Sequence, residues 1–207
     1  VAAILRAFPD LPRLRLSSLD SVEIDPLLRE LLASEARVMP HLHLSLQHGD
    51  DLILKRMRRR HGRADAVQLV HDLRARRPDL ALGADLIAGF PTETDAQHAA
   101  NLSLIAELGI VHGHVFAYSP RPGTPAARMP QVPREHVAAR ARELRAAAAD
   151  CRSAWLKTLI GRPLKVLAEA DGTGHAPNFA RVLLAPGTPA GALRTIVPTR
   201  VVEGLLA

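Results

Sequence analysis

The stretch GADLIAGFPTET, residues 83–94, constrains the fold of this chain more than any other. Ala84 to Ala88 is a short apolar run that predicts a buried strand, and Gly89 and Pro91 then break it. A strand that leads at once into a helix is the repeating unit of α/β proteins. At the carboxyl end of a parallel strand, such a junction faces the crevice in which these proteins bind ligands. The stretch therefore predicts a parallel sheet with a ligand site at this junction.

A helix is expected directly after the break and should run to about Leu108, with Gly109 as its C-cap. Thr92 or Thr94 would cap it, and Glu93 and Asp95 give it an acidic first turn that suits the positive end of the helix dipole. Gly89 would let the backbone approach a ligand closely, and the helix start would offer free N–H groups. An ordinary strand-to-helix turn has the same pattern, so the pattern alone leaves both interpretations open.

Composition and charge narrow the class of protein. The chain is 47% hydrophobic, which is enough for a sizeable core, and no apolar run approaches the roughly 18 residues of a membrane-spanning helix. No secretion leader is recognisable either, so we expect neither a membrane protein nor a secreted one. Lys and Arg number 27 against 21 Asp and Glu, and the net charge of +6 fits an anionic partner such as RNA. A genome rich in arginine codons would give the same excess.

The single cysteine, Cys151, excludes a disulfide within the chain and favours a cytoplasmic setting. An iron–sulfur cluster needs three or four thiolates, so this chain cannot ligate one by itself. The first residue is Val1 rather than methionine, which fits a piece of a longer protein.

Two strands are expected before residue 83. Residues 13–17 alternate Leu14 and Leu16 with arginine and serine, and a helix is expected over residues 22–34. Residues 41–47, HLHLSLQ, would place three leucines on one face and His41, His43, Ser45 and Gln47 on the other. His41 and His43 could bind zinc, but no third ligand is evident nearby, which favours hydrogen-bonded or surface histidines.

The segments that follow alternate between helix and strand. Asp50 is expected to cap a helix that ends in a run of basic residues: Lys55, Arg56, Arg58, Arg59, Arg60 and Arg63. This run is either a solvated helix end or an anion-binding surface. A helix over 63–77, the strand and helix of the junction, and a strand over 112–118 come next. That strand ends in YSPRPGTPAA, residues 118–127, whose prolines hold Arg121 on a stiff loop.

A change of pattern marks the last fifty residues. A long helix is expected over residues 133–159, followed by a turn at Asp171 and Gly172 and by short strands over 164–169, 179–184, 193–198 and 201–206. Short strands at this spacing predict a small antiparallel barrel.

Several of these segments together resemble one family. Residues 83–94 are similar to the GxIxGxxP-type stretch in the fifth strand of radical S-adenosylmethionine (SAM) enzymes, in the form found in methylthiotransferases. RLRLSSLD (13–20), HLHLSLQHGDDLILKRMRRRH (41–61) and residues 118–127 resemble that family's third-, fourth- and sixth-strand motifs, and GHAPNF (174–179) resembles its closing RNA-binding TRAM domain. The family usually has a small residue where this chain has His48.

The resemblance implies an α/β fold, in which a partial (β/α) TIM-like barrel of the radical SAM type lacks its first two units and is followed by a small all-β TRAM-like barrel. The implied boundaries are residues 1–132 for the barrel part, 133–160 for a linking helix and 161–207 for the RNA-binding β-barrel. Four strand–helix units are expected before the linking helix.

The same resemblance implies the cofactors, partners and site. SAM is the implied cofactor, with 4Fe-4S clusters whose ligands are not in this chain; the implied partner is the tRNA anticodon arm, in the cytoplasm, with no membrane and no DNA. Residues at matching positions are expected to line the SAM and substrate cavity: Ser17, Gln47, Arg59, Asp85, Gly89, Pro91, Tyr118 and Arg121. No catalytic residue and no metal ligand is assigned.

The implied activity is transfer of a methylthio group to C2 of N6-threonylcarbamoyladenosine beside the anticodon, by a longer protein of which this chain is the carboxyl part. The chain alone is expected to be inactive because the cluster cysteines are absent. Alternatives are an inactive RNA-binding remnant, or a methylthiotransferase for isopentenyl-adenosine or for a ribosomal protein.

Overall fold

The computed structural model describes residues 1–207. Its helices and strands follow one another in this order: α1 (Ala2–Ala7), the 3-10 turn η1 (Ser21–Glu23), α2 (Pro26–Ser34), β1 (His41–Gln47), α3 (Asp51–Arg56), α4 (Arg63–Arg76), β2 (Ala81–Ala88), α5 (Asp95–Leu108), β3 (Ile110–Ala117), the 3-10 turn η2 (Ala126–Arg128), α6 (Arg134–Lys157), β4 (Leu164–Ala168), β5 (Thr173–His175), β6 (Arg181–Leu183), β7 (Leu193–Ile196), β8 (Val201–Val202) and β9 (Leu205–Leu206).

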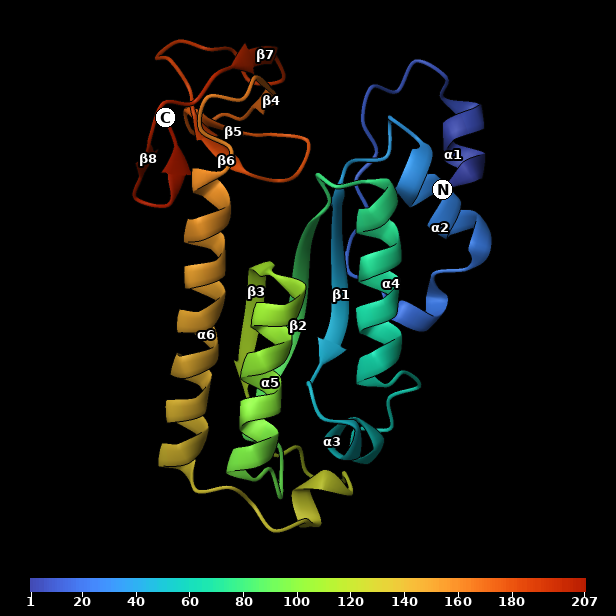
Figure 1. Cartoon of the computed structure of the whole chain (residues 1–207), viewed down its shortest axis with the longest axis vertical. Helices are drawn as coiled ribbons and strands as arrows, with labels where there is room; N and C mark the ends of the chain where they lie inside the picture. Colours follow the sequence, from blue (N-terminus) through green and yellow to red (C-terminus); the bar gives the residue numbers. More distant parts are fainter.

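The first part of the chain is an α/β layer built on a parallel sheet in the order β1-β2-β3 (Figure 1). Leu42 of β1 pairs with Leu82 of β2, and Ala84 of β2 pairs with Gly113 of β3. Paired residues on neighbouring strands face the same side of the sheet. The alternation of residues in HLHLSLQ places leucines on one face of β1 and polar residues on the other, as expected. The leucines Leu42, Leu44 and Leu46 are at most 1% exposed, whereas the histidine face is polar.

Helix α6 runs along the sheet beside β3 and α5 (Figure 1). Gly113 and Gly89 allow this close packing, because a Cβ on Gly113 would lie 2.8 Å from Cβ of Ala148, and a Cβ on Gly89 would lie 2.5 Å from the Val137 side chain. The long helix predicted over 133–159 is therefore present, and it covers the sheet as well as leading into the last part of the chain. None of the helices combines the length and the apolar character that a membrane-spanning segment requires.

The first expected strand is not regular. Its backbone forms only isolated parallel bridges, between Leu14 and Val38 and between Leu19 and Leu44, so three regular strands precede α6 where four were predicted. The physical reason is that the backbone hydrogen bonds of this segment fall at two separate places: Leu14 bonds with Arg37 and Met39, and Leu19 bonds with His43 and Ser45, so no continuous ladder forms between them. The guanidinium groups of Arg13 and Arg15 also donate to carbonyl oxygens of His175 and Ala176.

The helix predicted over residues 22–34 is also divided. The segment begins with η1 and restarts at Pro26, where the Asp25 carboxylate accepts a hydrogen bond of 2.7 Å from the Leu28 N–H. Proline has no N–H to donate within a helix, but it suits the first helical position. Pro26 therefore starts a new helix instead of continuing one.

The last fifty residues form a small β module around residues 161–207. Its six strands are two to five residues long and lie in the order β7-β4-β5-β6-β9-β8, antiparallel except for the β6–β9 pair. Three of the four predicted strand segments, 164–169, 179–184 and 193–198, each contain one strand. The strand predicted over 201–206 was wrong, because Glu203 and Gly204 form a turn that divides it into the antiparallel strands β8 and β9. Strand β5 was not predicted, because its central residue is Gly174 and glycine is unfavourable in strands. The module lies at the end of the parallel sheet where β1 begins (Figure 1).

Candidate functional site

A cavity lies at the carboxyl ends of the parallel strands. Its volume is about 490 Å³, and it is lined by Gln47, Ile87, Phe116, Ala117, Tyr118, Ser119, Arg121, Thr124 and Ala126. A neighbouring hollow of about 330 Å³ shares Gln47 and Ile87 and is lined also by Arg59. This is the edge of the sheet at which the sequence predicted a ligand site.

Four of the eight predicted site residues face these two hollows. Gln47, Tyr118 and Arg121 come from β1 and from the loop after β3, and they line the larger cavity together. Gln47 has a φ of 66°, a left-handed conformation that is uncommon for a residue other than glycine and that ends β1 abruptly. Arg59 lies in the second hollow and forms an ion pair of 3.5 Å with Asp20.

The β2–α5 junction differs from its expected form. The N–H groups of Gly89 and Phe90 both donate to Oε2 of Glu93, at 2.9 and 3.2 Å, so these groups serve the chain's own carboxylate and not a ligand. Gly89 has a φ of 72° and its close neighbour is Val137 of α6. Pro91 is buried at the same turn. The glycine is thus required for packing against α6.

Glu93 is the centre of a buried charge network. Its side chain is 0% exposed, and besides the two N–H groups it pairs with Nη1 of Arg140 at 3.2 Å and with Nε2 of His48 at 3.2 Å. His48 Nδ1 in turn accepts the N–H of Asp50 at 3.0 Å. The unusual His48 therefore ties the loop after β1 to the β2–α5 turn. Sequence reasoning assigned Glu93 to the first turn of a helix and missed Arg140, which lies 47 residues further on.

Of the two threonines expected to cap the helix after β2, one does so in the structure. Thr94 caps α5, and the side chains of Thr94 and Gln97 exchange hydrogen bonds with each other's backbone N–H. Thr92 has a φ of 68° and its hydroxyl accepts a hydrogen bond from Arg56. Gly109 ends α5 in the left-handed conformation, as its position predicts.

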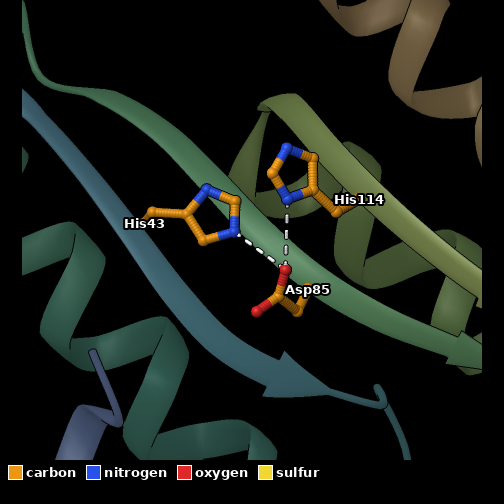
Figure 2. Close-up of side chains that lie close together, drawn as sticks. All are labelled: His43, Asp85 and His114. Atoms are coloured by element: carbon orange, nitrogen blue, oxygen red, sulfur yellow. Dashed lines mark hydrogen bonds and ion pairs between the residues drawn. The ribbon is translucent and has the colours of Figure 1, made fainter. Parts of the chain in front are cut away.

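Asp85 lies on β2, two residues before Ile87 of the cavity, and its side chain meets those of His43 and His114 (Figure 2). Its Oδ1 atom is 3.0 Å from Nε2 of His43 and 3.3 Å from Nδ1 of His114. Its Oδ2 atom accepts a hydrogen bond of 3.2 Å from the hydroxyl of Ser18. The predicted Ser17 is exposed and the neighbouring Ser18 makes this contact instead.

Each member of this cluster comes from a different strand of the sheet. His43 is on β1, Asp85 on β2 and His114 on β3. Gly83 on β2 makes room for the His43 ring, because a Cβ there would lie 2.4 Å from Nδ1 of that ring. The sequence did not identify His114, although the alternation in HGHVF could have placed it on the polar face.

His41 does not share a site with His43. Its ring packs against Phe179 of the β module, with 4.7 Å between ring centroids, and Phe179 also contacts His112 and lies under the guanidinium of Arg15. Burial lowers the pKa of both His41 and His112 to about 3, with Arg15 adding to the effect at His41 and His41 adding to it at His112. The zinc pair considered from the sequence is therefore not formed, because His41 belongs to the contact between the sheet and the β module.

The larger cavity fits SAM in its chemistry. Ile87 and Phe116 offer apolar surface to a flat base, and Gln47, Tyr118 and Arg121 offer polar groups, with a guanidinium suited to a carboxylate. The chain does not fit an iron–sulfur cluster, since Cys151 is its single cysteine and lies on α6, where burial raises the pKa of the thiol.

Comparison with known proteins identifies a family and several relatives. Residues 12–105 match the Radical SAM superfamily. The chain is 47% identical over 184 residues to the threonylcarbamoyladenosine tRNA methylthiotransferase MtaB of Rickettsia prowazekii, which covers 89% of this chain and 44% of that protein. It is 38% identical over 173 residues to the protein of the same name from Thermotoga maritima, covering 82% of this chain and 40% of that protein.

A second group of relatives carries a different name. The tRNA-2-methylthio-N(6)-dimethylallyladenosine synthase of Cereibacter sphaeroides is 42% identical over 162 residues, which is 78% of this chain and 37% of that protein. The chain thus spans less than half the length of the curated relatives that it matches. Over that length, it is a homologue of the radical SAM tRNA methylthiotransferases.

Proposed function

We propose that the chain is the carboxyl-terminal part of a radical SAM methylthiotransferase that modifies C2 of N6-threonylcarbamoyladenosine beside the tRNA anticodon. The observation that carries this proposal is the 47% identity, over 89% of the chain, to a protein named for that reaction. Relatives named for dimethylallyladenosine are 40 to 42% identical over a shorter part of the chain. The threonylcarbamoyl nucleoside is therefore the favoured substrate.

In this proposal, the carboxyl edge of the parallel sheet is one wall of the SAM and substrate cavity. Gln47, Arg59, Tyr118 and Arg121 are its polar groups, and Ile87 and Phe116 pack against a base. Bound SAM would supply the methyl group. Arg121 would hold a carboxylate by paired hydrogen bonds, and the amide of Gln47 would orient a ribose or base, which fixes the reacting groups relative to one another.

The four remaining predicted residues have other roles in this proposal. Gly89 and Pro91 shape the wall through the turn that Glu93 holds, and Asp85 pairs with His43 two residues before Ile87 of the cavity. Ser17 is exposed on the segment beside β1 and would contact substrate only where that segment meets the cavity.

The β module would bind the RNA. We assign residues 1–132 to the radical SAM part, 133–160 to the linking helix and 161–207 to a TRAM-like barrel. The module exposes basic side chains suited to phosphates: Arg162, Lys165, Arg194 and Arg200. Helix α6 has 24 residues and so spans about 36 Å, which would place these contacts about that far from the nucleoside in the cavity. A tRNA substrate also makes the cytoplasm the expected location.

The test uses the chain joined to the reading frame that precedes it in its genome. After reconstitution with iron and sulfide, the protein is incubated with SAM, a sulfide source and tRNAs that carry either threonylcarbamoyl- or isopentenyl-adenosine, and the nucleosides are measured by mass spectrometry. Methylthio product from the first tRNA supports the proposal. Product only from the second tRNA, or from neither tRNA, overturns the assigned substrate.

A second candidate function is RNA binding without catalysis, and the single cysteine favours it for the chain alone. The 207-residue chain would then bind a tRNA anticodon arm in a gel-shift assay, with an affinity that falls steeply as salt rises. A preceding reading frame without cluster cysteines would support this candidate, and a frame that encodes CxxxCxxC would reject it.

A further inference from the structure

Three potential metal ligands converge on one point of the parallel sheet (Figure 2). Nε2 of His43, a carboxylate oxygen of Asp85 and Nδ1 of His114 all lie within 4.8 Å of one another. Imidazole nitrogen and carboxylate oxygen are both established ligands of Zn²⁺ and of other first-row divalent metals. A set of two histidines and one carboxylate is a common ligand combination in sites that keep a coordination position open.

The distances suit a shared metal ion. Two atoms that each lie about 2.0–2.1 Å from a tetrahedral Zn²⁺ are about 3.3 Å apart. Oδ1 of Asp85 is 3.0 Å from Nε2 of His43 and 3.3 Å from Nδ1 of His114. The His114 side chain is 63% exposed, so its ring can turn to bring the two histidine nitrogens closer without disturbing the core. His43 is 10% exposed and is held in place above Gly83.

The surroundings of the three residues also fit a metal site. Ser18 donates a hydrogen bond of 3.2 Å to the second oxygen of Asp85, which fixes the carboxylate and leaves Oδ1 directed at the two rings. His43 and His114 line a hollow of about 410 Å³ on the same side of the sheet, so a bound ion would keep access to solvent. Water or a small anionic group would complete the coordination.

We propose that His43, Asp85 and His114 bind a single divalent metal ion of the zinc class, with an open position toward this hollow. The site is distinct from an iron–sulfur cluster, because it has no thiolate ligand and its three residues come from β1, β2 and β3. It goes beyond the proposed methylthiotransferase function. Metal binding at this cluster can be measured without SAM, tRNA or activity, so its failure would leave that function untouched.

The test is titration of the metal-free 207-residue chain with Co²⁺, followed by visible absorption and then by displacement with Zn²⁺. Co²⁺ with nitrogen and oxygen ligands in a site of low coordination number gives visible ligand-field bands, and it lacks the near-ultraviolet band of a thiolate ligand. We expect one Co²⁺ per chain, displaced by one Zn²⁺. His114→Ala and Asp85→Asn should each weaken binding by more than the roughly 10- to 100-fold loss that follows removal of an outer-shell partner, and Ser18→Ala should fall within that range.

Two matched variants control for other binding. His71→Ala removes an exposed histidine of α4, and Cys151→Ser removes the thiol; both should bind Co²⁺ like the unmodified chain. His114→Ala changes an exposed side chain, so it reports on binding even where Asp85→Asn disturbs folding, and thermal melting of each variant without metal checks this. Failure of the unmodified chain to bind, or equal binding by His114→Ala, would overturn the proposal. A thiolate band that disappears in Cys151→Ser would do the same.

Discussion

The parallel sheet and the β module are stabilised in different ways. One hydrophobic cluster of 25 buried residues includes the leucines of β1 and the inner faces of α4, α5 and α6, whereas the module has a cluster of 8, two of them Leu156 and Leu159 from α6 and the turn after it. The large cluster allows the sheet to carry histidines and an aspartate on its other face. The module has strands of two to five residues and depends on its contacts with α6, Arg13 and Arg15.

This difference in stabilisation suits the sheet and the module to two kinds of binding. On the sheet, polar groups are held at fixed places by a core on the opposite face, which suits a ligand site that must keep its geometry. The module presents basic side chains on short strands, which suits contacts with a charged backbone that need less exact placement. The comparison predicts that damage to the sheet unfolds the protein, while damage to the module loosens it locally.

Among the charge substitutions, the largest effect is expected from Glu93→Gln. Glu93 and Arg140 are both buried, and loss of the carboxylate charge leaves the guanidinium with the exposed Asp95, at 2.7 Å, as its one anionic partner. Removal of the buried half of the pair should cost about 3 kcal/mol. Chemical denaturation followed by circular dichroism should show this loss in the global unfolding transition. Glu143→Gln, at a half-exposed position on the same helix, should change the stability by less than about 1 kcal/mol. Equal losses for the two variants would contradict the buried network.

A matched pair of leucine substitutions compares the two regions directly. Leu44 in β1 and Leu206 in β9 are each 0% exposed. Leu44→Ala should cost about 3–5 kcal/mol of global stability, and Leu206→Ala about 2 kcal/mol, because the smaller module can collapse around a lost side chain. Hydrogen exchange should show faster exchange throughout the chain for the first variant and mainly within residues 161–207 for the second. Faster exchange throughout the chain for both variants would mean that the module is not a separate unit.

Acid should weaken the contact between the two regions. His41 and His112 have pKa values of about 3 in the folded protein and about 6.5 when unfolded, so their neutral forms are favoured by folding. Their contribution is complete above pH 6.5 and falls as the pH drops toward 3, by up to about 1.4 kcal/mol per pH unit for each histidine. Denaturation midpoints between pH 7 and pH 4 should show this slope. His41→Phe should reduce it, and an unchanged slope would exclude His41 as its source.

A smaller effect is expected from Arg15→Ala. Arg15 donates to the carbonyl oxygens of Ala176 and Pro177 at 3.3 and 3.1 Å, and its guanidinium carbon lies 4.6 Å from the centre of the Phe179 ring. Loss of these contacts should cost about 1–3 kcal/mol and make the module more sensitive to protease. Arg6→Ala, at an exposed position of α1, is the control and should behave like the unmodified chain.

Much of the fold follows from local patterns in the sequence. The alternation of HLHLSLQ, the cap at Thr94 and the glycine at residue 109 each depend on neighbouring residues, and the structure has the expected strand, helix start and helix end. The Arg13–Ser17 strand was wrong because the segment pairs only at two separate bridges, and its arginines bond to carbonyl groups more than 150 residues away. Local patterns cannot reveal such a partner.

The candidate site shows the same limit. Gln47, Tyr118 and Arg121 were expected in the site from the family resemblance; all three follow or end parallel strands, and parallel strands bring such ends to one edge. The partners of Asp85 were not predicted, because the register of three strands decides that His43 and His114 meet it while His41 does not. The burial of Glu93 likewise depends on Arg140 from α6.

The most direct test of this account is a calorimetric titration with SAM. The protein extended by the preceding reading frame and reconstituted with iron and sulfide is compared with its Gln47→Ala and Arg194→Ala variants, and with the 207-residue chain alone. We expect SAM to bind the extended protein, Gln47→Ala to weaken it by about tenfold or more through loss of a cavity hydrogen bond, and Arg194→Ala in the module to leave it unchanged. Equal affinity of the Gln47→Ala variant would contradict the assignment of the cofactor cavity to this edge of the sheet, and tight binding of SAM to the short chain without iron would contradict a dependence of SAM binding on the iron–sulfur cluster.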